Sequence, residues 1–230
     1  MIGIFDSGIG GLTILEEIKK IITHNSIIYY ADSKNNPYGI KTDKELEEIT
    51  SNIVDYLISK KCQVIVVACN TATTRCIKYL RNKYPNIIFI GTEPAIKIAC
   101  DNNHKRTLVL GTQATINSLS VKKLIKNYKH NDQQIYLESC LGLANAIETN
   151  NDKEVDFLLD KYLSPYHDID SIVLGCTHYP YVKNKILKYF PNSKIYDSSL
   201  GVAKELKRVL TINKLLKEKG KQDIKIIKDA

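Results

Sequence analysis

Short apolar runs alternate with segments of helical periodicity along almost the whole chain. Two clear examples, "QVIVVA" at residues 63–68 and "SIVLG" at residues 171–175, are apolar throughout rather than at every second position. A strand that is apolar on both faces must be covered on both faces, which is typical of parallel sheets flanked by helices. The pattern therefore predicts an α/β fold built on doubly wound parallel sheets.

The apolar runs form two sets that resemble each other, and this predicts two similar α/β domains. In each half a glycine-containing turn closes the first run and a cysteine closes the third. Ser7 precedes Cys69 by nearly the same number of residues as Thr112 precedes Cys176. The eight expected strands lie at residues 2–5, 26–31, 63–68 and 86–91, and then at 106–111, 134–138, 171–175 and 194–197.

Two further segments carry clear local signals. Residues 43–60 place apolar side chains on one helical face, and Thr42 with Glu45 three residues later is a capping box that starts this helix. Near the end of the sequence, "IKII" at residues 224–227 allows one additional edge strand.

Composition limits the class of protein. The chain has 230 residues, of which 43% are hydrophobic and 25% charged, as in ordinary soluble globular proteins. No apolar run approaches the 18 residues of a membrane span, and "MIGIFDSGIG" does not resemble a secretory signal, so we expect a cytoplasmic protein with no membrane partner.

The formal net charge of +8 comes mostly from lysine, because only four of the 33 basic residues are arginines. Base readout and phosphate clamping depend on arginine and on stacking aromatic residues. We therefore interpret the charge as a solvated lysine-rich surface and expect no nucleic-acid partner. A mild attraction for anionic small molecules remains open.

The cysteines do not follow a metal-binding or disulfide pattern. None forms a C-x-x-C pair or a zinc-finger array, so we expect no metal site and reduced thiols. Most buried cysteines are small hydrophobes, and four are assigned that role: Cys62, Cys76, Cys100 and Cys140. Cys69 and Cys176 differ because each follows directly on an apolar strand.

Ligands of open α/β sheets bind beyond the carboxyl ends of the strands, so the residues that follow each strand are the candidates for a site. The first strand is followed by "DSGIGG", whose glycines match neither a P-loop nor a G-x-G-x-x-G motif. We expect a helix near Gly11 to point free N–H groups toward a carboxylate or phosphate.

The remaining strand ends carry thiols, hydroxyls and amides, with one acid and one histidine, and no lysine placed for a Schiff base. This inventory suits a small zwitterion or carboxylate and leaves the chemistry to the thiols. The candidate residues are Asp6, Ser7, Tyr38, Gly39, Asn70, Thr71, Thr112, Thr115, Thr177 and His178, beside Cys69 and Cys176. For Tyr38, an exposed loop tyrosine without a function is an equal alternative.

Both thiols are expected at the start of a helix, where the dipole favours a thiolate. Asp6 is expected beside Cys69, and His178 beside Cys176. Two bases that face one substrate can invert a carbon centre, one removing a proton and the other returning one. Two other classes stay open: a hydrolase that uses a single cysteine as nucleophile, and an anion-binding module in which both thiols are inert.

Four motifs in this order, "FDSGIGGLT", "NPYG", "VVACNTAT" and "LGCTHYP", resemble the glutamate racemases of the cofactor-independent aspartate/glutamate racemase superfamily. The resemblance runs from residue 1 to about residue 215. It implies two α/β domains with the active site in the cleft between them. It also implies interconversion of L- and D-glutamate for peptidoglycan synthesis, without any cofactor or metal.

By position, the resemblance makes Cys69 and Cys176 the two acid/base residues and the ten candidates above the substrate contacts. It implies a first domain of residues 1–97 plus 206–230 and a second of residues 98–205, with a C-terminal helix from about Leu206 packed on the first. Glu148 is not included, because "LESCLGLANAIE" departs from the expected proline-containing segment. Aspartate as the substrate is an alternative, and formation of a homodimer is left open.

Overall fold

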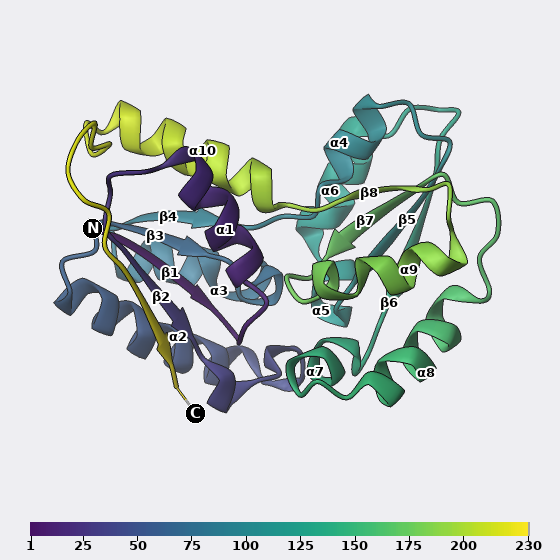
Figure 1. The fold of residues 1–230 in the computed structure, drawn as a ribbon, viewed down its shortest axis with the longest axis horizontal. Helices are drawn as coiled ribbons and strands as arrows, with labels where there is room; N and C mark the ends of the chain where they lie inside the picture. Colours follow the sequence, from purple (N-terminus) through teal and green to yellow (C-terminus); the bar gives the residue numbers. More distant parts are fainter. Residues whose placement is uncertain (230) are drawn as a thin grey trace. The chain divides into compact units, whose positions relative to one another are not determined.

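The computed structural model describes residues 1–229. The chain forms two compact units (Figure 1). The first consists of Met1–Thr92 together with the segment from Ser199 onward, and the second of Glu93–Ser198.

The sheet of the first unit contains five parallel strands in the order β4-β3-β1-β2-β9. Ile4 of β1 lies opposite Tyr29 of β2 on one side and Val66 of β3 on the other. The segment "IKII" is an edge strand, as predicted, because β9 pairs with β2. The strands are β1 (Ile2–Asp6), β2 (Ile27–Ala31), β3 (Val64–Val67), β4 (Ile88–Gly91) and β9 (Ile224–Lys228).

Helices cover both faces of this sheet, because alternate side chains of each strand point to opposite faces and nearly all are apolar. Val64 and Val66 belong to a core that includes helices α1 (Leu12–Ile21) and α10 (Ser199–Ile212). Ile65 and Val67 belong to a second core with α2 (Asp43–Ser59) and α3 (Asn70–Lys83). Figure 1 shows α10 lying along α1.

The expected start of α2 and the expected packing of the last helix are both confirmed. Thr42 Oγ1 accepts the Glu45 N–H while the Glu45 carboxylate accepts the Thr42 N–H, which is a complete capping box. The last helix, α10, packs on the first unit through Val202, Ala203 and Leu206, although it begins at Ser199 rather than near Leu206.

The second unit repeats the architecture with four parallel strands in the order β6-β5-β7-β8. One face packs on α4, α5 and α6, and the other on α7, α8 and α9. The strands are β5 (Arg106–Gly111), β6 (Gln134–Ser139), β7 (Ser171–Gly175) and β8 (Lys194–Tyr196). The helices are α4 (Ile96–Asp101), α5 (Gln113–Ile116), α6 (Leu119–Tyr128), α7 (Leu143–Glu148), α8 (Asp152–Leu163) and α9 (Lys183–Tyr189).

The two sheets therefore share one strand order if each set is numbered from its own first strand. The first strand lies between the second and the third, and the fourth lies beyond the third. In both units the helix after the first strand covers one face, whereas the helix after the third covers the other. The predicted doubly wound α/β fold is confirmed, and each sheet has a topological switch point between its first and third strands.

The chain passes from one unit to the other between residues 92 and 93 and again between residues 198 and 199. The boundaries expected from the sequence were 97/98 and 205/206. The latter positions fall inside α4 and α10. Each helix packs as a whole on one sheet: Ile96, Ala99 and Cys100 of α4 share a core with Val109 and Val173 of the second unit. The structural division therefore comes before each helix.

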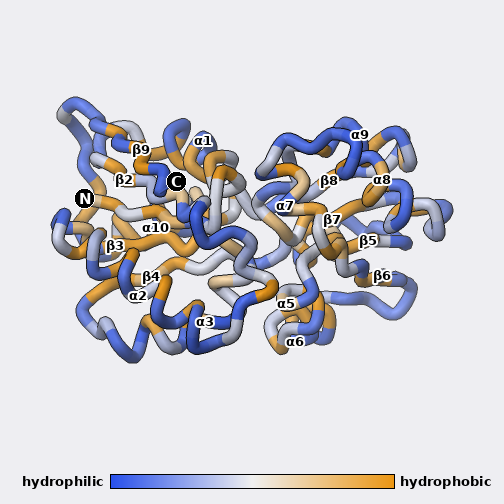
Figure 2. Tube along the Cα trace, turned by 90° about the horizontal axis from the view of Figure 1, so that it is seen from below, coloured by the Kyte–Doolittle hydropathy of each residue, from blue (hydrophilic) through white to orange (hydrophobic). Residues whose placement is uncertain are grey.

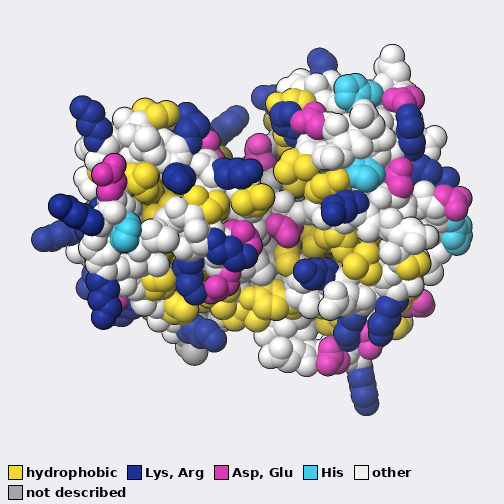
Figure 3. Space-filling view, turned by 45° about the horizontal axis from the view of Figure 1, so that its top comes forward, with side chains coloured by type: hydrophobic (Ala, Val, Ile, Leu, Met, Phe, Trp, Pro, Cys, Tyr) yellow, Lys and Arg dark blue, Asp and Glu magenta, His cyan; other side chains and the backbone are white. Residues whose placement is uncertain are grey.

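Polar and apolar residues are segregated along the chain. Figure 2 shows hydrophobic strands, and mostly hydrophilic loops. On the face seen in Figure 3, Lys and Arg side chains are dispersed among Asp and Glu and form no continuous patch. Within the described residues, none of the helices has the length and apolar character needed to cross a membrane.

Burial of Cys76 predicts a loss of stability at alkaline pH. Burial raises the pKa of its thiol from 9.0 to about 11, so the neutral thiol is favoured in the folded state. The neutral Cys76 thiol makes its full contribution to the free energy of unfolding below pH 9, and this contribution is lost as the pH rises through 11. We expect the difference in unfolding free energy between the parent and Cys76→Ala to narrow from pH 9 to 11 in urea titrations. A constant difference would contradict this expectation.

Candidate functional site

The first thiol lies at the switch point of the first sheet. Cys69 follows β3 and is the N-cap residue of α3, and Ser7 follows the neighbouring strand β1. The Cys69 Sγ donates to Ser7 Oγ over 3.8 Å, and both side chains are 5% exposed. The prediction that Cys69 begins a helix is confirmed, so the positive end of the α3 dipole lies at this sulfur.

Asp6 is buried beside the glycine turn rather than turned toward an open anion site. Its Oδ2 accepts the Gly11 N–H at 2.8 Å. The next two amides are also used, since Leu12 N–H donates to Ile9 O and Thr13 N–H to Gly10 O. The expectation that these helix N–H groups are free for a ligand is therefore wrong, because the turn and Asp6 satisfy them internally.

The loop after β2 brings Tyr38 inside the unit. Tyr38 is 2% exposed and its hydroxyl donates to Asp32 Oδ2 at 2.6 Å, so the alternative of an exposed loop tyrosine is wrong. Burial, and then the charge of Asp32, raise the pKa of Tyr38 well above its ordinary value. Gly39 is exposed, and no atom lies within 4 Å of the position that a Cβ would take.

Asn70 and Thr71 form the first turn of α3 and are both 3% exposed. The Asn70 amide donates to Thr92 O at 3.3 Å. The predicted residues Asp6, Ser7, Asn70 and Thr71 thus gather with Cys69 at one pair of strand ends, which we call the Cys69 half-site.

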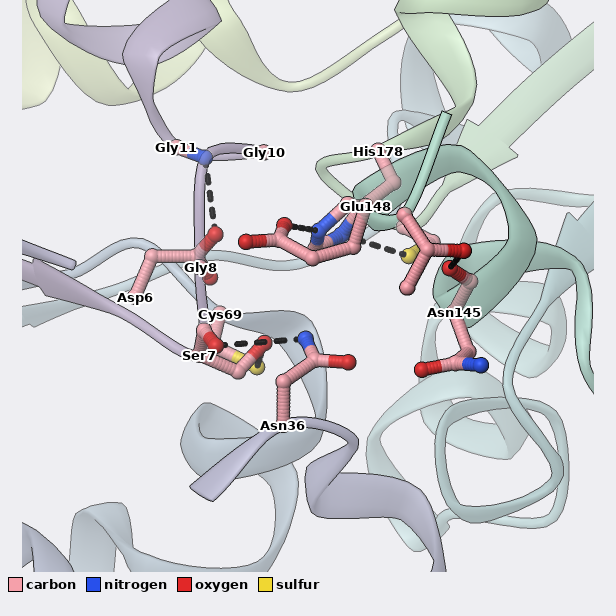
Figure 4. Close-up of polar contacts among 12 residues, drawn as sticks. Asp6, Ser7, Gly8, Gly10, Gly11, Asn36, Cys69, Asn145, Glu148 and His178 are labelled. Carbon is pink, nitrogen blue, oxygen red and sulfur yellow. Dashed lines mark hydrogen bonds and ion pairs between the residues drawn. The ribbon is translucent and has the colours of Figure 1, made fainter. Parts of the chain in front are cut away.

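The second thiol lies at the switch point of the second sheet, where Cys176 follows β7. Its Sγ is 3.9 Å from His178 Nδ1, as expected from the sequence. His178 Nε2 is 2.7 Å from Glu148 Oε2 at the end of α7, and the two side chains are 1% and 10% exposed. Figure 4 shows this line of Glu148, His178 and sulfur. With Thr177, these residues form the Cys176 half-site.

The expectation that Cys176 begins a helix is wrong. The chain after it enters a 3₁₀ turn at Tyr179–Val182, and α9 begins only at Lys183. Cys176 is therefore separated from the start of α9 by this 3₁₀ segment, and its ionic neighbour is the His178–Glu148 pair.

Thr112 and Thr115 lie beside β7, because they follow its neighbour β5. Thr112 caps α5 by accepting the Thr115 N–H, and the two hydroxyl oxygens are 3.0 Å apart. Thr115 is fully buried, whereas Thr112 is half-buried and presents its side chain at the strand end.

The four cysteines assigned to packing are buried, as predicted, and none of the six cysteines forms a disulfide. Burial raises the pKa of Cys62 to about 11, as it does for Cys76, and it also raises the pKa values of Cys100 and Cys140. These thiols are held in their neutral form.

Two further residues lie at the half-sites. Glu148 was set aside because its segment departs from the expected proline-containing one, but it pairs with His178. Asn36 donates its amide to Ser7 O at 3.1 Å, and the only sequence signal is its place directly before Pro37 and Tyr38.

The fold and these half-sites define a two-domain α/β protein with a buried thiol at the same topological position of each domain. The chain belongs to the Asp/Glu/hydantoin racemase family, whose model matches residues 10–203.

Individual relatives agree with this assignment. The chain is 40% identical over 227 residues to a glutamate racemase of Clostridium novyi, covering 96% of this chain and 87% of that protein. It is 42% identical over 232 residues to one of Clostridium perfringens, with 97% and 89% covered. The crystal structure of the Francisella tularensis glutamate racemase in complex with D-glutamate is similar with a TM-score of 0.83 at 31% identity, covering 100% of this chain and 88% of that one.

Close packing around Gly11 predicts that a methyl group there disturbs the Cys69 half-site. A Cβ would lie 2.8 Å from the Tyr29 hydroxyl and 2.9 Å from the Cβ atoms of Asp6 and Ala68. We expect Gly11→Ala to lower the free energy of unfolding, measured by urea titration, by about 1–3 kcal/mol. Gly39→Ala, which meets open space, is the control. Equal stability of the two variants would contradict the packing argument.

Proposed function

We propose that the protein is a glutamate racemase that interconverts L- and D-glutamate with two cysteines as the acid and base. The observation that carries the proposal is the repeated placement of a buried thiol after the third strand of each sheet. The curated relatives and the solved structures with 28–31% identity are named glutamate racemases, which supports glutamate as the substrate.

In the proposed reaction the thiolate of Cys69 removes the α-proton of D-glutamate, so that the C–H electron pair stays on carbon as an S–H bond forms. The thiol of Cys176 then delivers its proton to the opposite face of the same carbon and becomes a thiolate. For L-glutamate the two roles exchange. The α-carbon loses one proton to Cys69 and gains one from Cys176. After the reaction Cys69 is therefore a neutral thiol and Cys176 a thiolate.

The surroundings of each thiol suit this exchange. A cysteine thiol has an ordinary pKa of about 8.5, so a base at neutral pH needs stabilisation as a thiolate. The α3 dipole supplies it at Cys69, and the Ser7 hydroxyl, which accepts from the neutral thiol, can turn its O–H to donate to the thiolate. His178, which Glu148 can hold as an imidazolium, supplies it at Cys176. Asp6 orders the turn that carries Ser7 through its bond to Gly11.

The α-carbon of an amino acid is a very weak acid, and this proposal includes no cofactor to accept its electrons. Preorganised donors must therefore stabilise the developing charge. The proposed substrate contacts are Asp6, Ser7, Tyr38, Gly39, Asn70, Thr71, Thr112, Thr115, Thr177 and His178. Because Tyr38 donates its hydroxyl to Asp32, we expect it to contribute its backbone rather than its hydroxyl. We further propose a cytoplasmic role in supplying D-glutamate for peptidoglycan.

The two-cysteine reaction predicts that each thiol is needed in both directions. Cys69→Ala and Cys176→Ala should lower racemisation of either enantiomer of glutamate by about 1,000-fold or more, because general acid–base catalysis contributes about 100- to 10,000-fold. Circular dichroism of glutamate with purified protein and no added cofactor measures this rate. In D2O the parent should place deuterium at the α-carbon of the product enantiomer.

Cys100→Ala is the matched control, since Cys100 is a buried thiol outside both half-sites. Racemisation by Cys176→Ala near the parent rate would overturn the two-base scheme. A burst of acyl-enzyme with one cysteine dispensable would instead indicate a hydrolase, and a preference for aspartate in a parallel assay would change the substrate assignment.

The Glu148–His178 contact predicts that removing the negative charge of Glu148 lowers kcat. Glu148→Gln keeps an oxygen that can accept from His178 but removes the charge that stabilises an imidazolium. We expect kcat to fall by about 10- to 100-fold with a smaller change in KM, measured by initial rates for both enantiomers. Glu138→Gln is the matched control, because Glu138 accepts a 2.7 Å bond from Tyr166 instead. Equal effects of the two substitutions would refute this role of Glu148.

A further inference from the structure

Asn36 carries a buried polar atom that the described residues leave unsatisfied. Within residues 1–229 its amide oxygen Oδ1 has no hydrogen-bond partner, although nearly every buried polar atom in a folded protein has one. A buried acceptor without a donor costs free energy unless a ligand or water supplies that donor.

The orientation of this amide is fixed by chemistry. The other amide atom, Nδ2, lies 3.1 Å from the backbone oxygen of Ser7, which can only accept. The NH₂ group must therefore face Ser7, and Oδ1 must face the opposite way. Figure 4 shows Asn36 with its nitrogen toward Ser7 and its oxygen turned away from it.

The segment around Asn36 is held in place before any ligand binds. The Asn36 N–H donates to Ser33 O. Asp32, at the start of the same segment, accepts the Asn35 amide at 2.8 Å and the Tyr38 hydroxyl at 2.6 Å. The unsatisfied oxygen is therefore preorganised, which is what a binding contact requires.

The position of Asn36 and the chemistry of its oxygen indicate which ligand atom it takes. The Asn36 side chain lies beside the Cys69 half-site, because its Nδ2 donates to Ser7 O and the Ser7 hydroxyl is 3.8 Å from the Cys69 sulfur. An amide oxygen only accepts, and a substrate carboxylate also only accepts. The one group of an α-amino acid that offers N–H donors is its ammonium.

We propose that Asn36 is a substrate-binding residue whose Oδ1 accepts a hydrogen bond from the α-ammonium of the amino acid. The inference rests on the proposed function, because it assumes that an α-amino acid binds at the Cys69 half-site. By holding the ammonium, Asn36 fixes the rotation of the α-carbon relative to the Cys69 sulfur.

Two ligands that differ by the ammonium group test this role. Dissociation constants are measured by calorimetry for racemic glutamate, in which turnover causes no net change, and for glutarate, which lacks the ammonium. Asn36→Ala should weaken glutamate binding roughly 10- to 100-fold, as expected for a charged hydrogen bond, and leave glutarate binding within about twofold of the parent. Asn36→Asp keeps an acceptor for the ammonium but loses the donor to Ser7 O, so it should recover the preference for glutamate over glutarate without restoring the parent affinity.

Asn35→Ala is the matched control, because the Asn35 amide supports the segment through Asp32. It should change the binding of both ligands by the same factor. Equal weakening of both ligands by Asn36→Ala, or no weakening of either, overturns the proposal and assigns Asn36 a structural bond to Ser7 or a water site. Racemisation by the parent is measured alongside: a parent that binds glutamate without racemising it refutes the proposed function and leaves the Asn36 comparison valid.

Discussion

Parallel pairing of the first strand with the third is the constraint on which each half-site depends. In the first unit β1 pairs with β3, and in the second β5 pairs with β7. Because the helices that follow the two strands cover opposite faces, the chain leaves the two strand ends in opposite directions and the ends stay accessible to side chains. Ser7 and Cys69 come together for this reason, as do Thr112 and Cys176. Neither pair is close in sequence.

Each half-site also depends on carboxylates that hold neighbouring groups of the protein in place. Asp6 holds the Gly11 amide, Asp32 holds Tyr38 and Asn35, and Glu148 holds His178. A buried carboxylate is costly without such partners. These three acids therefore order the turns and rings around the thiols, and the strand ends retain thiols, hydroxyls and amides for chemistry.

The sequence was sufficient for the fold and for the residues at strand ends, because apolar runs and their following residues are local features. These local features could not reveal which side chains hydrogen-bond to one another in the folded chain. Asp6 uses the Gly11 amide that looked available, and Tyr38 points its hydroxyl to Asp32. Glu148 reaches His178 from a helix 30 positions earlier in the chain. A helix was also predicted to begin at Cys176, but the chain forms only a 3₁₀ helix from Tyr179 before α9 begins.

The last of these differences makes the two half-sites chemically unequal although their strand order is the same. Cys69 has an α-helix N-terminus and a hydroxyl, which are fixed dipoles that do not titrate at neutral pH. Cys176 has a histidine backed by a carboxylate, which can change charge in that range. The same strand-end position of a thiol is therefore surrounded by fixed dipoles in the first unit and by a histidine–carboxylate pair in the second.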